Sequence, residues 1–190
     1  MNSLPSKRIG AVLASIALGL SACSAELDER GFIEDDNPPE LTFSDEVGVD
    51  IPAAAFDFVA SELFSGDPVD GAALFENAPT MLVFADPNCP ICVADGPELA
   101  EAALEISDVN VVVVHSFAQS EAYLAYVERS DLSAESILHI VDTEGVLSLR
   151  FGLTATPATV MVAADGQVTV VSGALGVEGF KEAADLLVNA

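Results

Sequence analysis

An uninterrupted apolar segment, Thr80 to Ala85, is followed after three residues by the sequence Cys89-Pro90-Ile91-Cys92. Apolar residues without polar alternation are typical of a strand that is buried on both faces of a parallel sheet. Helix-forming residues then continue from Pro90 to about Ile106, with apolar positions at helical spacing. The sequence therefore predicts that both cysteines lie where a buried strand gives way to a helix.

Two thiols separated by two residues at the start of a helix can exchange a disulfide with another molecule. The unpaired N–H groups and the dipole of a helix N-terminus favour the thiolate, and Pro90 suits the first helical position, where no N–H is needed. Cys89 is therefore the expected N-cap and attacking nucleophile. Cys92, nearly one turn further along, is the expected resolving thiol. No cofactor is implied, because the two sulfurs carry the electrons themselves.

Other uses of the cysteine pair remain open. A structural disulfide is one of them, although a bridge closing so short a loop constrains little of the unfolded chain. A metal site would need further ligands, and His115 and His139 are the only histidines, so we expect no metal and place both histidines at strand ends or in the core. Haem attachment is excluded, because Val93 and not a histidine follows Cys92.

The first 22 residues have the pattern of a targeting signal that is removed from the mature chain. Lys7 and Arg8 form its basic region, and residues 9–20 form an apolar run that is shorter than the ~20 residues of a transmembrane helix. Residues 23–50 hold many acids and a Pro-Pro pair, which is typical of an unstructured tether. Residues 51–190 have the length of one ordinary domain.

The signal ends in Leu20-Ser21-Ala22-Cys23, which resembles the lipobox of bacterial lipoproteins. The resemblance implies that Cys23 is lipidated and anchors the domain to the extracytoplasmic face of the cell membrane. An ordinary secretory cleavage site beside a free cysteine is the alternative.

The charge of the chain excludes one class of partner. Two of the six basic residues and none of the 31 acidic residues precede Cys23, which leaves the mature chain a formal charge of −27. Such a field disfavours nucleic acid and anionic lipid headgroups and favours solubility or basic partners. We therefore expect no nucleic-acid binding.

Further strands and helices are predicted on both sides of the cysteine pair. Before it, a β-hairpin (residues 56–63 and Val69) and a helical turn (72–76) are expected. After it come strands at 111–114 and 160–163, a short extra strand at 137–141, a hairpin partner at 168–171, and helices at 119–129 and 177–188. This order resembles the thioredoxin fold, an α/β fold in which helices flank a central mixed sheet, here with an extra N-terminal β-hairpin.

A narrower resemblance is to the TlpA/ResA-like branch of the redoxins, which are extracytoplasmic thioredoxin-like thiol-disulfide oxidoreductases. It rests on the leading hairpin and on Asp142, Gly145, Phe151, Gly152, Pro157, Asp165 and Gly166. The resemblance implies that Thr156-Pro157 is a cis-proline loop that lies against the cysteines and binds a client peptide through the Thr156 backbone. A trans proline that only interrupts a loop is the alternative.

Asp95 lies three residues after Cys92 and hence on the same helical face, where a carboxylate can accept the proton of the resolving thiol. The resembled family often has a glutamate at this place, and a solvated helix residue is the plain alternative. Asp86 and Asp95 both place negative charge near the sulfurs and oppose the thiolate. A less stable thiolate favours the disulfide, and hence a reducing protein.

These features together predict a lipoprotein that reduces exported cysteine-containing proteins, such as apocytochrome c, with electrons from a membrane thiol donor. A disulfide isomerase or maturation factor is a second hypothesis, because Asp-Pro-Asn-Cys-Pro-Ile-Cys also resembles the motif of methylamine-dehydrogenase accessory proteins. A non-catalytic thioredoxin-fold binding module is a third. A peroxidase is disfavoured, because Asp86 occupies the place of the peroxiredoxin Thr or Ser.

Overall fold

The computed structural model describes residue 51 and residues 53–116, 120–133 and 135–190. The predicted signal and tether, residues 1–50, lie outside these residues, as does the lipidation candidate Cys23. No helix within the described ranges is long and apolar enough to cross a membrane.

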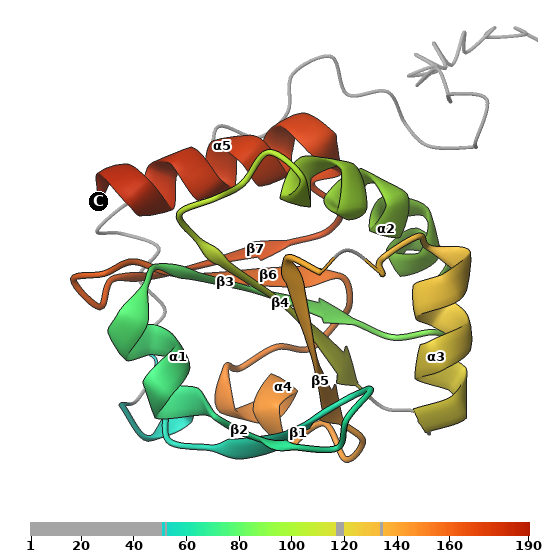
Figure 1. The fold of residues 1–190 in the computed structure, drawn as a ribbon. Coiled ribbons are helices and arrows are strands. Elements are labelled where there is room, and N and C mark those ends of the chain that lie inside the picture. Colours follow the sequence, from blue (N-terminus) through green and yellow to red (C-terminus); the bar gives the residue numbers. More distant parts are fainter. Residues whose placement is uncertain (1–50, 52, 117–119, 134) are drawn as a thin grey trace, which may run out of the picture. The chain divides into compact units, whose positions relative to one another are not determined.

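The described residues form a mixed sheet with helices on both of its faces (Figure 1). The strands are β1 (Val59–Glu62), β2 (Pro68–Asp70), β3 (Thr80–Ala85), β4 (Asn110–Ser116), β5 (Ile137–Asp142), β6 (Ala158–Val162) and β7 (Val168–Ser172). The helices are η1 (Ala53–Ala55, a 3-10 turn), α1 (Gly71–Asn77), α2 (Pro90–Ala103), α3 (Ser120–Arg129), α4 (Val146–Arg150) and α5 (Gly176–Asn189). The sequence prediction of a central mixed sheet flanked by helices is confirmed.

The strand order across the sheet is β2-β1-β5-β4-β3-β6-β7. β3, β4 and β5 run parallel to one another, and the remaining neighbours are antiparallel. The sequence predicts β5 only as a short extra strand, whereas in the structure it lies inside the sheet between β4 and β1. β1 and β2 pair with each other and extend the sheet beyond β5 at that edge.

β3 occupies an inner position of the sheet, and all six of its residues are buried. Met81 and Val83 belong to the core cluster that includes residues of α2, α3 and α5, whereas Leu82 and Phe84 belong to the cluster that includes residues of α1 and α4. The absence of polar alternation in this segment is therefore explained by apolar packing on both faces. The last buried residue of this segment, Ala85, is also the last residue of β3, and the cysteine pair follows it.

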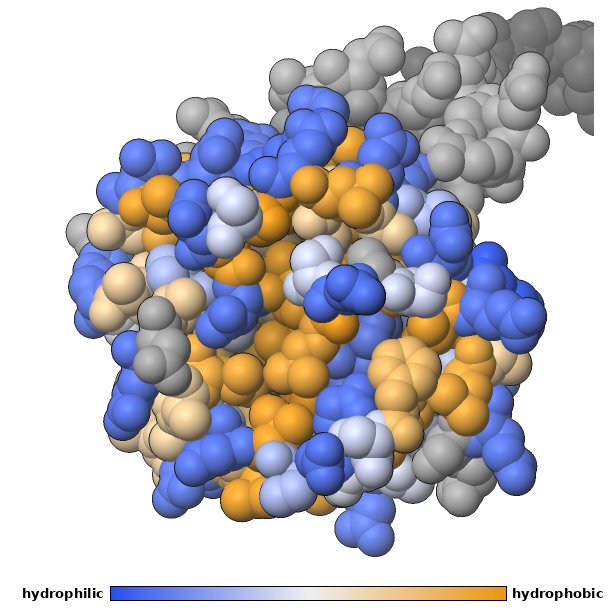
Figure 2. Space-filling model, viewed as in Figure 1, coloured by the Kyte–Doolittle hydropathy of each residue, from blue (hydrophilic) through white to orange (hydrophobic). Residues whose placement is uncertain are grey.

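The acidic character of the chain is visible on the helices that cover one face of the sheet. Hydrophilic residues gather over α5 and α2 along the top of Figure 2. Glu101, Glu105, Glu178 and Asp185 are exposed there. Lys181 Nζ lies 3.0 Å from Glu105 Oε1 and 3.7 Å from Glu178 Oε1. Exposed ion pairs of this kind contribute little to the stability of the fold. The main effect of these acidic residues is the negative charge that they give to this surface.

Candidate active site

The turn between β3 and α2 is closed by Asp86. Its Oδ1 accepts hydrogen bonds from the Asn88 backbone N–H at 2.8 Å and from Asn88 Nδ2 at 3.1 Å. Its backbone carbonyl accepts a hydrogen bond from the Cys89 N–H at 3.0 Å. An aspartate that bonds the backbone two residues further on forms a tight turn, and this turn delivers the chain to the first residue of the helix. The local sequence thus places Cys89 at the N-terminus of α2.

Cys89 is the N-cap of α2, with φ −84° and ψ 113° and with Pro90 following at the start of the helix. Its Sγ accepts a hydrogen bond from the Cys92 N–H at 3.1 Å, so the sulfur satisfies one of the unpaired donors of the first turn. The Cys89 side chain is half-buried, whereas Cys92 is only 1% exposed, and both are free thiols in this structure. Of the two sulfurs, that of Cys89 is therefore the more accessible.

The environment of Cys92 favours its protonated form. Burial raises the pKa of the Cys92 thiol, and its hydrogen bond with the Cys89 side chain raises it further. Hydrogen bonds with the Asp86 backbone and with the Thr156 side chain act in the opposite direction but do not reverse the shift. Cys92 is thus held as a thiol beside the Cys89 sulfur.

The loop before β6 lies against the cysteines. The Thr156–Pro157 peptide bond is cis, so the alternative of a trans proline is wrong. Cys89 Sγ donates a hydrogen bond to the Thr156 carbonyl oxygen at 3.5 Å. β6 pairs antiparallel with β3, and this pairing brings two segments that are 67 residues apart to the same end of the sheet. Thr156 is half-buried, so part of the loop remains open beside Cys89.

Asp95 is 7% exposed, so the interpretation of a solvated helix residue is wrong. Its Oδ1 accepts a hydrogen bond from the Gly176 N–H at 3.0 Å, which ties α2 to the first residue of α5. Burial raises the pKa of the Asp95 carboxyl to about 6, although hydrogen bonds from the Gly176 and Leu175 backbones favour the carboxylate. A carboxyl group that titrates near neutrality is suited to accepting and returning a proton.

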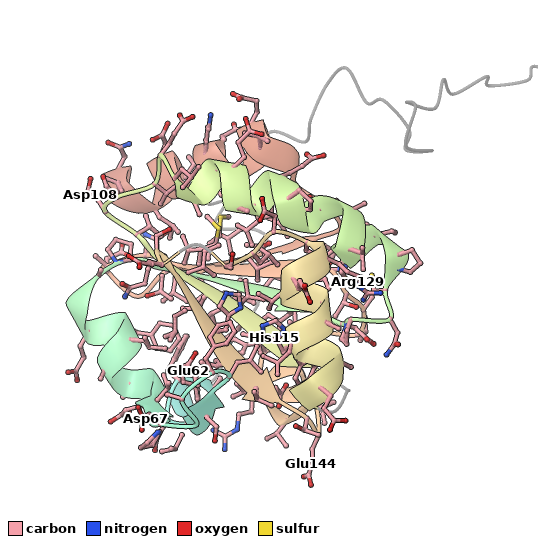
Figure 3. All side chains as sticks on the ribbon, turned by 45° about the vertical axis from the view of Figure 1, so that its right-hand side comes forward. Glu62, Asp67, Asp108, His115, Arg129 and Glu144 are labelled. Carbon is pink, nitrogen blue, oxygen red and sulfur yellow. The ribbon has the colours of Figure 1, made fainter. Side chains whose placement is uncertain are left out.

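Two contacts from α3 to the active-site segment were not predicted from the sequence. Tyr126, which lies within the helix predicted at residues 119–129, donates a hydrogen bond from its hydroxyl to the Cys92 carbonyl oxygen at 3.0 Å. Arg129, labelled at the end of α3 in Figure 3, donates from Nη2 to the Pro87 carbonyl oxygen at 3.3 Å. Helical spacing shows that a residue is helical, but it does not show which distant segment the residue contacts.

The two histidines are core residues next to this site, in agreement with the sequence prediction. His115 is 0% and His139 1% exposed, and His115 Nε2 lies 2.9 Å from His139 Nδ1. Burial, followed by the neighbouring His139, lowers the pKa of His115 to about 3, and burial also lowers the pKa of His139, so both rings are neutral at physiological pH. Among the residues that the structure describes, no three His, Cys, Asp or Glu side chains are grouped to hold a metal ion.

Comparisons with known proteins agree with this geometry. The sheet order, the cysteine that caps α2 and the cis-proline loop beside it place the chain in the class of thioredoxin-like thiol-disulfide oxidoreductases. Within that class, the redoxin profile matches residues 46–186, and the chain belongs to the redoxin family.

Individual proteins are also similar to this chain. The soluble secreted antigen MPT53 of Mycobacterium tuberculosis is 34% identical over 115 residues, which are 60% of this chain and 64% of MPT53, so the match spans less than two thirds of that relative. The structure of a secreted M. tuberculosis disulfide oxidoreductase homologous to E. coli DsbE is 29% identical, with a TM-score of 0.62, covering 73% of this chain and all of that one. The methylamine utilization protein MauD of Methylophilus methylotrophus is 27% identical over 106 residues, 55% of this chain and 47% of MauD.

Proposed function

We propose that this chain is an extracytoplasmic protein-disulfide reductase in which Cys89 and Cys92 transfer two electrons to exported proteins. The observation that supports this most directly is the asymmetry of the two thiols. Cys89 is half-buried at the N-terminus of α2, and the Cys92 N–H donates to its sulfur, whereas Cys92 itself is buried. In this proposal a client disulfide reacts with the accessible Cys89 sulfur and not with the buried Cys92 sulfur.

The reaction consists of two thiol-disulfide exchanges. The Cys89 thiolate attacks one sulfur of the client disulfide, forms a Cys89–client disulfide and releases the first client sulfur as a thiolate. Cys92 then loses its proton and attacks Cys89 Sγ, which forms the Cys89–Cys92 disulfide and releases the second client thiolate. The client gains two electrons and two protons, and the oxidised pair is restored by an external dithiol, for which we propose a membrane thiol donor.

Thr156 and Asp95 have supporting roles in this proposal. The Thr156 carbonyl already accepts a hydrogen bond from Cys89, so a client strand that pairs with this loop would lie alongside the attacking sulfur. Asp95 lies one turn beyond Cys92 on α2, and its pKa of about 6 suits it to take the proton that Cys92 must lose. The bond between Asp95 and Gly176 would then weaken while Asp95 holds that proton.

Two features favour reduction over oxidation. Burial raises the pKa of Cys92, and Asp86 and Asp95 add carboxylates before and after the cysteine pair. Strong oxidants of this class stabilise their dithiol form, chiefly by stabilising a thiolate, and these features act against a thiolate. We therefore expect the disulfide form to be comparatively stable.

The first experiment is the reduction potential of the pair in a Cys23→Ser variant, in which these are the only two cysteines. The protein is equilibrated with glutathione or dithiothreitol, and free thiols are counted by alkylation. A potential near or below the thioredoxin value of about −270 mV supports a reductase. A value near about −120 mV, that of a strong oxidant, would overturn the proposed direction, and a bond that neither reductant opens would indicate a binding module.

Disulfide isomerisation is the second candidate function. Two observations favour it: the similarity to MauD, and the resemblance of the segment from Asp86 to Cys92 to the motif of methylamine-dehydrogenase accessory proteins. An isomerase is expected near about −180 mV, the potential of protein disulfide isomerase. It should also recover activity from a scrambled-disulfide client without net consumption of reductant, which a reductase should not do.

The location of the protein follows from Cys23 in this proposal. Lipidation of Cys23 would hold the domain at the membrane through the acidic segment of residues 24–50. In a bacterial host, the wild-type chain is expected in the membrane fraction and the Cys23→Ala variant in the soluble extracytoplasmic fraction. An equal distribution of the two proteins would contradict lipid anchoring.

A further inference from the structure

Tyr126 connects α3 to the first turn of the active-site helix. Its side chain is 2% exposed, and its hydroxyl donates a hydrogen bond to the Cys92 carbonyl oxygen at 3.0 Å. We propose that Tyr126 is a positioning residue for the resolving step, because it holds the backbone of Cys92 in the orientation from which this thiol attacks Cys89. The inference rests on the proposed order of attack, Cys89 first and Cys92 second.

The backbone N–H groups of Cys92 and of the next residue, Val93, both donate hydrogen bonds to Cys89. The Cys92 N–H donates to Cys89 Sγ at 3.1 Å, and the Val93 N–H donates to the Cys89 carbonyl at 3.1 Å. The Cys92 carbonyl and the Val93 N–H belong to one peptide group, so a hydroxyl that donates to this carbonyl polarises the N–H toward Cys89. Tyr126 thereby stabilises the turn that sets the distance between the two sulfurs.

Close packing between α2 and the end of α3 limits how far Tyr126 can move. A Cβ atom placed on Gly96 of α2 would clash with Ser130 Cβ, so the backbone of α2 approaches Ser130 as closely as a glycine permits. Ser130 lies one helical turn after Tyr126, and the Ser130 N–H donates to the Tyr126 carbonyl at 2.9 Å. A shift of α3 that would carry the phenol away from Cys92 must therefore disturb this close contact.

The histidine pair holds the other side of the phenol ring. His115, which Figure 3 shows between the sheet and α3, contacts the Tyr126 ring edge-on with centroids 5.8 Å apart. His115 in turn is hydrogen-bonded to His139, whose Nε2 lies 2.9 Å from the Leu132 carbonyl oxygen. Because the Leu132 carbonyl only accepts, His139 carries its proton on Nε2 and accepts from His115 through Nδ1. The Tyr126 ring therefore packs against a histidine that is itself held by a hydrogen bond.

Tyr126→Phe removes only the hydroxyl and tests the inference. A disulfide-bonded model peptide is mixed with the full, reduced chain, and the reaction is quenched with acid at successive times. Mass spectrometry of the Cys89–peptide disulfide gives the rate constants of attack and of resolution in one sample. We expect attack to change by less than about twofold and resolution to slow about fivefold, the effect of losing one ordinary hydrogen bond.

The ratio of the two rate constants separates positioning from stability. A loss of stability that leaves the variant folded under the assay conditions, as a urea unfolding curve measures, does not change this ratio. Tyr123→Phe is the matched control, since Tyr123 is another fully buried phenol of α3 whose ring lies 5.1 Å from that of His115. A normal ratio in Tyr126→Phe, or an equal change in Tyr123→Phe, would overturn the inference.

Cys92→Ser separates this inference from the function on which it rests. If Cys92→Ser fails to accumulate the Cys89–peptide disulfide, the proposed order of attack is wrong. If it accumulates that disulfide and Tyr126→Phe resolves it at the wild-type rate, only the positioning role is wrong.

Discussion

Replacement of Cys89 with serine is expected to lower disulfide reduction by about a thousandfold or more, because an alcohol at this position forms no thiolate and no mixed disulfide. Replacement of Cys92 with serine should leave the attack intact and stop the reaction after it. The two variants are therefore expected to be equally inactive over many turnovers and different after one. Turbidity of reduced insulin measures the first quantity, and a non-reducing gel of the client complex measures the second.

The reason for this difference is the unequal exposure of the two sulfurs. Cys89 is half-buried and Cys92 is 1% exposed, so a client can form a stable complex with Cys89 alone. Cys23→Ser retains both site cysteines and serves as the control, with unchanged turnover expected. A client complex that forms through Cys92 in Cys89→Ser and not through Cys89 in Cys92→Ser would reverse the assigned roles.

The strand-to-helix junction could be predicted from the sequence because its signals are local. Six apolar residues in a row require burial on both faces, and Cys89-Pro90 has the preferences of a helix start. The end of this helix differs from the prediction. The prediction extends the helix to about Ile106, whereas α2 ends at Ala103, and Leu104 is 77% exposed in the structure. Helix-forming residues that follow the last buried position give no signal of where the helix stops.

α4 was not predicted, because its start depends on contacts that the sequence shows only indirectly. It is five residues long and begins after Gly145, whose φ is 68°. The buried Asp142 carboxylate accepts hydrogen bonds from the Leu147 N–H at 3.1 Å and from the Ser148 N–H at 3.2 Å. Asp142 and Gly145 were noted in the sequence only for their resemblance to redoxins. Physically, Gly145 is the N-cap of this short helix, and Asp142 accepts hydrogen bonds from two N–H groups of its first turn.

The burial of Asp95 could not be predicted from the sequence either, because it too depends on distant contacts. Helical spacing places Asp95 on the face of Cys92, but its burial depends on α5, which is 81 residues away at Gly176. A sequence pattern gives no pKa for such a group, since the pKa depends on how much water the distant segment removes. Tyr126, His115 and His139 were missed as a connected set for the same reason, because β4, α3 and β5 meet only in the folded chain.

Asp95 and the histidine pair are expected to affect stability in opposite directions as the pH falls. The pKa of Asp95 is raised from 3.8 to about 6, so its contribution is fully present below about pH 4 and is lost as the pH rises through 6. The pKa of His115 is lowered from 6.5 to about 3, so its contribution is present above pH 6.5 and is lost as the pH falls. Each of these two shifts corresponds to about 3 kcal/mol between pH 4 and neutrality, and the lowered pKa of His139 acts in the same direction as that of His115.

Asp95→Asn should therefore reveal both effects at once. Asparagine keeps an oxygen for the Gly176 N–H and carries no charge, so the variant is expected to be stabilised relative to wild type by about 3 kcal/mol more at pH 8 than at pH 4. Its own free energy of unfolding should decrease toward acid as the histidines become protonated. Urea unfolding at half-unit pH steps measures both.

Asp95→Ala also removes the acceptor for Gly176 and should be about 1 kcal/mol less stable than Asp95→Asn at every pH. A constant difference between wild type and Asp95→Asn from pH 4 to 8 would show that Asp95 does not titrate in this range, and would remove it as the proton acceptor for Cys92.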